Sequence, residues 1–110
     1  MTVAEARKVV DAVLPTSVKR HPHHLVIELS RDHDGCLVYY AYQRPGKITF
    51  PVGYWSIDTR TAEVWNDLIS ERVSNKQLVR VQLAIRKRLG VTDHEQSASI
   101  SNPCYERDSK

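Results

Sequence analysis

Cysteine and glycine are both scarce in this sequence, and each scarcity excludes a class of protein. The two cysteines, Cys36 and Cys104, are too few and too far apart for a zinc framework or for the disulfide pattern of a small secreted domain. We therefore expect two free thiols. The four glycines form neither a phosphate-cradling loop nor the Gly-x-Ser-x-Gly turn of serine hydrolases, so neither site is predicted.

Long apolar runs are also missing, and no stretch approaches the roughly 20 apolar residues that span a membrane. The first fourteen residues include Glu5, Arg7, Lys8 and Asp11, whose charges exclude the apolar core of a signal peptide at this terminus. Of the 110 residues, 41% are hydrophobic and 26% are charged, as is usual for a globular domain. We expect one cytoplasmic domain that folds without metal or disulfide and has no membrane partner.

Two capping boxes predict the starts of two helices. Thr2 with Glu5 precedes apolar residues that recur at helical spacing until Pro15. Ser74 with Gln77 opens a second helix that runs to about residue 90 and carries one apolar stripe. That stripe predicts a helix packed against a sheet or a partner.

Between these helices the sequence has the period-two alternation of strands. Strands are expected over 25–30, 36–43, 48–58 and 62–66, with a bulge near Gly53. The last two form a hairpin, in which Asp58 and Thr61 can bond the backbone of a tight turn. Trp55 and Trp65 on its arms are predicted to lie in the core.

The predicted fold is therefore α+β: an N-terminal helix, an antiparallel sheet of about four strands and a C-terminal helix packed on the sheet. Residues 1–90 form the single domain. From Val91 onward the residues are mostly polar, and we expect 91–110 to be a flexible polar tail.

Positive charge is concentrated in the predicted C-terminal helix. Residues 74–90 contain five basic side chains and no acidic one, whereas the whole chain carries a formal charge of only +3. Such a helix could bind phosphates or an acidic protein surface. Cations near the end of a helix also complement its dipole, and a basic face is often only solvated, so a purely structural reading stays open.

The aromatic side chains suggest a second surface. Tyr40, Tyr42 and Tyr54 fall on predicted strands, where alternation sends some side chains outward. Tyrosine is enriched in protein interfaces, so an exposed sheet face could recognise a partner. Cross-strand aromatic contacts that only stabilise the sheet are the alternative.

No arrangement of residues predicts catalysis or metal binding. The histidines of the sequence His21-Pro22-His23-His24 are poorly spaced for a metal ion and are interpreted as part of a polar linker. Cys36 could pair with a histidine base, but a cysteine within a strand among aromatic residues is usually an inert part of the core. Asp58 and Glu63 as paired carboxylates would have to be brought together from separate elements, and turn formation already explains Asp58. We expect no enzyme activity, catalytic residue, metal or cofactor.

The order of the predicted elements and the sequence of the hairpin resemble those of a known family. The helix that begins Thr2-Val3-Ala4-Glu5-Ala6, the strands and the sequence Ile57-Asp58-Thr59-Arg60-Thr61-Ala62-Glu63-Val64 are similar to small PepSY-like domains and to similarly built immunity proteins of bacterial toxin systems. The family pattern is Val-Asp-x-x-Thr-Gly-Glu-Val, so this chain has Ala62 in place of the glycine. The match covers about residues 2–66.

The resemblance implies a non-enzymatic module that binds another protein, and in the immunity branch a cognate toxin or effector domain. The alternative is a nucleic-acid-binding or regulatory module that uses the basic helix 74–90. Pairing of the protein with itself is left open. The residues expected to contact the partner are Tyr40, Tyr42, Arg44, Lys47, Arg80 and Lys87.

Overall fold

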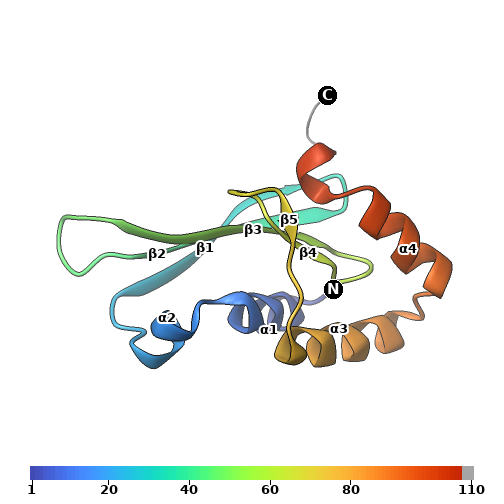
Figure 1. The fold of residues 1–110 in the computed structure, drawn as a ribbon, viewed down its shortest axis with the longest axis horizontal. Coiled ribbons are helices and arrows are strands. Elements are labelled where there is room, and N and C mark those ends of the chain that lie inside the picture. Colours follow the sequence, from blue (N-terminus) through green and yellow to red (C-terminus); the bar gives the residue numbers. More distant parts are fainter. Residues whose placement is uncertain (108–110) are drawn as a thin grey trace.

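The structure, a computed structural model, describes residues 1–107, and within them a five-stranded antiparallel sheet lies above a layer of helices (Figure 1). The strands follow one another across the sheet in chain order, β1-β2-β3-β4-β5. The predicted α+β fold class is confirmed, with one strand more than expected. The strands are β1 (Leu25–His33), β2 (Cys36–Gln43), β3 (Phe50–Asp58), β4 (Val64–Asn66) and β5 (Glu71–Arg72). The helices are α1 (Val3–Val13), α2 (Thr16–Arg20), α3 (Lys76–Leu89), α4 (Asp93–Ser101) and the 3-10 turn η1 (Cys104–Glu106).

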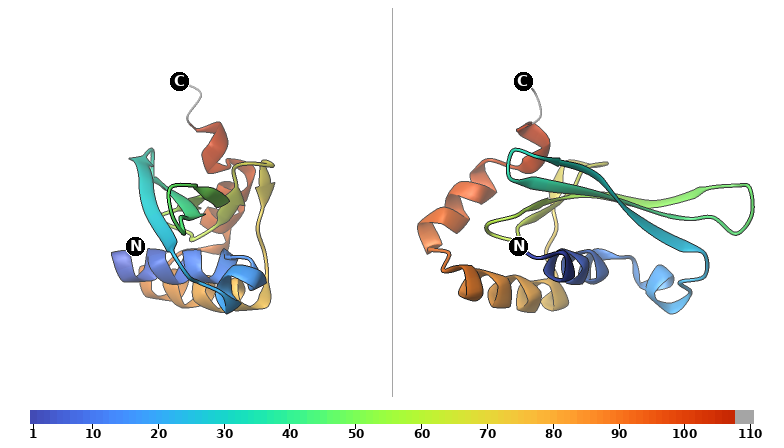
Figure 2. Two further views of the ribbon diagram at one scale, coloured as in Figure 1. Left: turned by 90° about the vertical axis from the view of Figure 1, so that its left-hand side faces the viewer. Right: turned by 180° about the vertical axis from the view of Figure 1, so that it is seen from behind.

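Helices α1 and α3 lie side by side beneath the sheet (Figure 2). The predicted capping box of α1 is present: Thr2 Oγ1 accepts from the Glu5 amide at 3.0 Å, and Glu5 Oε1 accepts from the Thr2 amide at 2.8 Å. The capping box predicted for α3 is wrong by one residue. Asn75 is the N-cap, because its side-chain oxygen accepts from the Leu78 amide at 2.8 Å. None of the helices within residues 1–107 is long and apolar enough to cross a membrane.

The main core lies between the sheet and these helices. Alternation along β2 and β3 directs one set of side chains toward α1 and α3, and among them Trp55 is only 3% exposed. Inward-facing members of this core are Tyr39, Ala41, Trp55 and Ile57 from the sheet and Ala6, Val9, Val10, Leu78 and Ile85 from the helices. The opposite face of the sheet, which we call the outer face, carries Tyr40, Tyr42 and Tyr54.

The predicted bulge near Gly53 is confirmed and has a packing reason. Ala41 pairs with Gly53 whereas Tyr42 pairs with Pro51, so β3 carries one extra residue, Val52. The indole of Trp55 lies over Gly53, and a Cβ at this position would stand 2.3 Å from the ring. Only glycine leaves room for the indole here.

The turn between β3 and β4 is built as the sequence predicts. Asp58 Oδ1 accepts from the amides of Arg60 and Thr61, at 2.8 and 3.0 Å. Thr61 Oγ1 accepts from the Glu63 amide at 3.4 Å. Ala62 has a φ of 62°, so alanine occupies a left-handed turn position that favours glycine.

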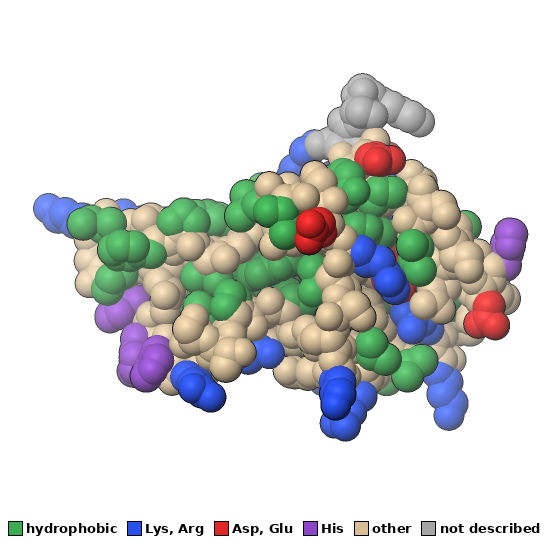
Figure 3. All heavy atoms as spheres, viewed as in Figure 1, with side chains coloured by type: hydrophobic (Ala, Val, Ile, Leu, Met, Phe, Trp, Pro, Cys, Tyr) green, Lys and Arg blue, Asp and Glu red, His purple; other side chains and the backbone are tan. Residues whose placement is uncertain are grey.

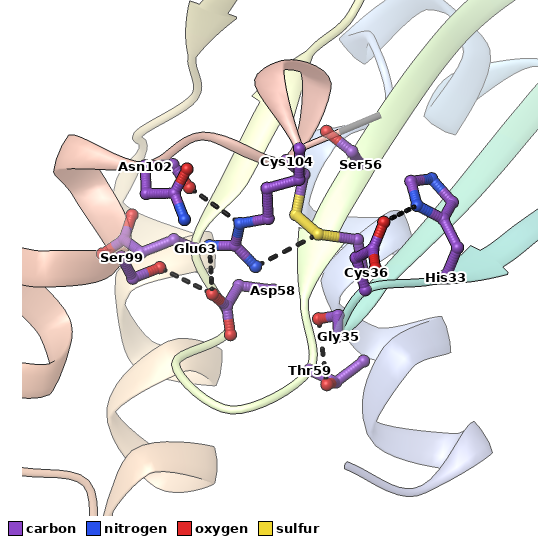
Figure 4. The surroundings of a disulfide bond; sticks show 12 residues. His33, Gly35, Cys36, Ser56, Asp58, Thr59, Glu63, Ser99, Asn102 and Cys104 are labelled. Atoms are coloured by element: carbon purple, nitrogen blue, oxygen red, sulfur yellow. Dashed lines mark hydrogen bonds and ion pairs between the residues drawn. A yellow bond between two sulfur atoms is a disulfide. The ribbon is translucent and has the colours of Figure 1, made fainter. Parts of the chain in front are cut away.

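The two cysteines are not free thiols. Cys36 and Cys104 form a disulfide and are both buried, with Trp65, in a second small core (Figure 4). Trp65 is therefore buried as predicted, but against the outer face. The free-thiol expectation failed because spacing along the chain does not reveal which segments meet in the fold. Cys36 begins β2, and η1 returns to cover it from the other end of the chain.

The segment predicted as a flexible tail forms α4 and η1. Thr92 with Glu95 is a capping box that opens α4, and Ser99 of this helix donates to Asp58 Oδ2 at 2.8 Å. The segment carries few apolar residues, which is why composition suggested a tail. It is instead held by the disulfide, by polar contacts and by an ion pair between Arg107 and Asp58. Residues 108–110 of the predicted tail lie outside the described residues.

Candidate partner-binding surface

Three tyrosines form one cluster on the outer face of the sheet. Tyr40 pairs with Tyr54 across β2 and β3, and their ring centroids are 5.5 Å apart. The ring of Tyr42 lies 5.2 Å from that of Tyr40. All three side chains are half-buried, because they cover one another as well as the sheet. The three rings therefore pack against one another across the strands and still leave surface available to a partner. We call this cluster the tyrosine face.

Two hydroxyl groups of the tyrosine face are fixed by residues of β1. Tyr42 donates to Glu28 Oε1 at 2.8 Å, and the hydroxyls of Tyr54 and Ser30 are 2.7 Å apart. The hydrogen bond to the Glu28 carboxylate, together with partial burial, raises the pKa of the Tyr42 phenol above its usual value. Tyr42 is therefore a neutral donor at physiological pH. The rings are held in place by β1, so little order has to be gained when a partner binds.

The connection between β2 and β3 projects beyond the helical layer as an arm (Figure 1). We define the arm as this connection together with Phe50, the first residue of β3, that is, residues 44–50. It carries Arg44 and Lys47, both exposed, and two apolar side chains: Ile48 is 66% exposed and Phe50 is 51% exposed. In Figure 3 basic side chains stand at the end of the arm, next to hydrophobic ones, with histidines below.

Some basic side chains of α3 pair with carboxylates of the fold, and others are exposed to solvent. Arg86 donates to the Thr61 carbonyl at 3.1 Å and lies 3.6 Å from the buried carboxylate of Glu63. Arg88 donates to Glu5 Oε2 at 2.7 Å. This bond from Arg88, supported by the Thr2 amide, lowers the pKa of Glu5 to about 2. Arg86 and Arg88 thus stabilise the fold, whereas Lys76, Arg80 and Lys87 are exposed.

The six residues expected to contact a partner fall on two separate surfaces. Tyr40 and Tyr42 lie on the tyrosine face, and Arg44 and Lys47 follow on the adjoining arm. Arg80 and Lys87 lie on α3, which covers the other face of the sheet. Sequence position could not separate the two groups, because that required knowing which face of the sheet α3 covers.

A polar cavity that the sequence did not reveal lies beside the tyrosine face. It measures about 130 Å³ and is walled by Tyr54, by Arg31 and His33 of β1, by Asp67 and by the η1 residues Cys104 and Tyr105. Ser56 donates to Asp67 Oδ1 at 2.6 Å, and burial raises the pKa of the Asp67 carboxyl. No signal in the sequence links these residues, since the cavity is closed by the disulfide-bound C-terminal segment.

The groups considered for catalysis are occupied by the fold. Cys36 is bonded to Cys104, so it offers no thiol nucleophile. Asp58 is paired with Arg107, and Glu63 accepts from Arg72 at 2.8 Å. Residues 21–24 form an exposed link between α2 and β1, as predicted. Within residues 1–107 no three His, Cys, Asp or Glu side chains gather in a group that could hold a metal ion.

The chain is similar to a known protein in its fold. No family model matches the chain, and no curated protein matches its sequence. Its fold is similar to that of a chain in the structure of a type VI secretion system effector–immunity complex from Pseudomonas protegens. The TM-score is 0.65 at 14% sequence identity, over 89% of this chain and 84% of the other. At this identity the likeness concerns the fold.

Proposed function

We propose that the protein is a non-enzymatic immunity or inhibitor protein that binds and neutralises a cognate bacterial toxin or effector. The observation that carries the proposal is the fold shared, over most of both chains, with a chain of an effector–immunity complex. Fold alone does not fix function, so the surface must supply the second support. The tyrosine face supplies it, because it presents rigid aromatic side chains of the kind that anchor protein interfaces.

The interface we propose runs along the outer face and onto the arm. Tyr40 and Tyr42 form its aromatic part, and Arg44 and Lys47 form its basic part. Occluding the partner's site by a bound surface needs no catalytic group in this chain. PepSY-like kinship is not needed for this proposal.

The experiment is a protection assay. The product of an adjacent open reading frame is expressed in a heterologous bacterium with and without this chain, and survival is counted. Survival that depends on this chain, together with co-elution of the two proteins in gel filtration, is the expected result. If the neighbouring gene product is toxic and this chain does not reduce its toxicity, the proposal is wrong. The same gel filtration measures whether the free chain pairs with itself.

A nucleic-acid-binding module built on α3 is the alternative from the sequence. Lys76, Arg80 and Lys87 remain available for phosphates, but Arg86 and Arg88 are engaged with Glu63 and Glu5. Titration of labelled duplex DNA at low and at physiological salt tests it. A phosphate binder loses affinity steeply as salt rises.

The proposed function also depends on the cellular compartment in which the protein binds its partner. Disulfides persist mainly in oxidising compartments and are usually transient or redox-sensing in the cytosol. The sequence leads us to expect a cytoplasmic address, and the redox state of Cys36 and Cys104 in the cell tests it. Alkylation of thiols in living cells before lysis decides the point: a cytoplasmic, reduced chain takes up reagent at both cysteines, and an oxidised chain takes up none.

A further inference from the structure

Two acid-free stretches of the chain meet at one end of the molecule. Residues 12–27 and 41–57 contain Lys19, Arg20, Arg44 and Lys47 but no aspartate or glutamate. The fold joins them: Gln43 Nε2 donates to the His21 carbonyl at 3.0 Å, and the Arg44 amide donates to the His24 carbonyl at 3.0 Å. Four cations are thereby concentrated at one end of a chain whose total formal charge is +3. We call this region the basic end.

The charges of the basic end are not neutralised by carboxylates of its own segments. Lys19 Nζ donates to the neutral side chain of Gln77 at 2.9 Å, so its charge remains. Arg20, Arg44 and Lys47 are exposed. Three exposed histidines, His21, His23 and His24, lie in the same region and can add hydrogen-bond donors. A surface of one sign attracts a partner of the opposite sign and orients it during encounter.

Apolar side chains accompany these cations along the arm. Ile48 and Phe50 are the apolar residues of the arm with large exposed fractions, 66% and 51%. Pro45 and Pro51 flank them, and each fixes its own φ angle, which lowers the entropy cost of holding the arm in one shape. A projecting segment with exposed apolar side chains and neighbouring basic ones is complementary to a cleft with an apolar floor and an acidic rim.

We propose that the arm inserts into such a cleft of the effector, with Ile48 and Phe50 on its floor and Arg44 and Lys47 against acidic side chains of its rim. This inference rests on the proposed function, and it assigns the neutralising contact to the arm rather than to α3. A nucleic acid is the less fitting occupant. The exposed, branched aliphatic side chain of Ile48 finds no complement on a phosphate backbone.

The test uses the full chain and the product of the adjacent reading frame. The double variant Arg44→Glu, Lys47→Glu reverses the charge of the arm. The double variant Arg80→Glu, Lys87→Glu makes the same charge change on α3. We expect the arm variant to raise the Kd about 100-fold, since like charges then face each other in the interface. The α3 variant should change the Kd less than about threefold, as is usual for charges outside an interface.

A reciprocal exchange identifies the rim. Acidic residues of the effector are changed to lysine one at a time, and one of them should restore binding to the chain that carries Lys47→Glu. Rescue by such an exchange supports the acidic cleft. An α3 variant that weakens binding as much as the arm variant, or an arm variant that binds like the wild type, overturns the inference while the proposed function stands.

Failure of the proposed function is recognised separately, because the wild-type chain then neither protects nor binds. In that case the arm is tested alone in the native cell, with photoreactive p-benzoylphenylalanine in place of Phe50. The control places it at Leu68, an apolar residue after β4 that is 68% exposed, against 51% for Phe50. A position-50 crosslink within an acidic cleft of a protein supports the inference. Crosslinks to nucleic acid, equal crosslinks from both positions, or none at all overturn it.

Discussion

Arg107 and Asp58 form an ion pair in which Arg107 Nη2 donates to Asp58 Oδ2 at 2.8 Å. Burial alone would raise the pKa of the Asp58 carboxyl. The bonds from Arg107, from the amides of Thr61 and Arg60 and from Ser99 together outweigh burial, so the pKa lies below its usual range. One oxygen of Asp58 closes the hairpin turn and the other holds the C-terminal segment, so a single carboxylate joins two parts of the chain that are far apart in sequence.

Replacing Arg107 should therefore loosen the C-terminal segment. We expect Arg107→Ala to lower the free energy of unfolding by about 2 kcal/mol, the usual size of a hydrogen bond to a charged group. The pair is nearly buried, with side chains 14% and 8% exposed, so little of this is screened by solvent. Urea unfolding followed by tryptophan fluorescence measures it. Arg7→Ala, which breaks the exposed pair with Asp11, is the control and should cost less than about 1 kcal/mol.

Acid should destabilise the protein through three carboxylates. The pKa of Glu5 is lowered to about 2 by Arg88, and the pKa values of Asp58 and Glu95 are also lowered. A carboxyl whose pKa is lower in the folded than in the unfolded chain stabilises the fold above the unfolded pKa, near 4, and this is lost as pH falls toward the folded pKa. Stability should therefore fall between about pH 5 and pH 2.

Urea unfolding at a series of pH values checks this dependence. Glu5→Gln should give a shallower fall than the wild type, because one of the three groups no longer titrates. Asp67 acts in the opposite sense, since burial raises its pKa and the fold is then favoured by the protonated form. Asp67→Asn should consequently steepen the fall. A stability that is flat from neutral pH to pH 3 contradicts the ion-pair assignments.

The disulfide should contribute a large share of the stability. It closes a loop across 68 residues, and the loss of chain entropy in the unfolded state predicts about 4 kcal/mol for a loop of this size. Cys104→Ser should lower the free energy of unfolding by about this amount. Mass spectrometry after alkylation without reductant should find neither cysteine modified in the wild type. Two modified cysteines in the folded, air-purified chain would refute the bond.

Local patterns in the sequence predicted α1, α3 and the first four strands but missed α2, β5 and α4, and they did not predict contacts between distant segments. The Thr2–Glu5 box, the alternation of β2 and the turn at Asp58 are each encoded within a few residues, so they could be read directly. The partners of Cys36 and Arg107 lie in other parts of the chain, and no local pattern encodes them. For the same reason, Tyr40 and Tyr42 could be proposed as partner contacts from the sequence of β2 alone. The sequence could not show that Arg80 lies on the other side of the sheet.

Gly53 and Gly46 offer a matched pair of substitutions in one hairpin. Gly53→Ala places a methyl group against the indole of Trp55, so Trp55 or the strand must shift. We expect a loss of about 1–3 kcal/mol, as for other overpacked cores. Gly46→Ala in the arm meets no atom within 4 Å and should be nearly neutral. Thermal melts of both variants check this, and equal melting temperatures would show that the indole is not held over Gly53.

Tyr40 and Trp55 lie close together on the sheet but on opposite faces, so their removal should have opposite consequences. Tyr40→Ala removes a half-buried ring whose neighbours are Tyr42 and Tyr54, and should cost less than about 1 kcal/mol of stability. It should weaken effector binding by tenfold or more, because aromatic anchors carry much of an interface's energy. Tyr40→Phe keeps the ring and should retain most of the affinity.

Trp55→Ala should instead cost about 3–5 kcal/mol of stability, since its indole is buried between the sheet and the helices. Any binding that remains should have the wild-type Kd once the folded fraction is accounted for. A cooperative thermal melt combined with a binding titration separates the two effects. If Tyr40→Ala abolished the melt, or if Trp55→Ala weakened binding of the folded fraction, the division into a core face and a recognition face would be wrong.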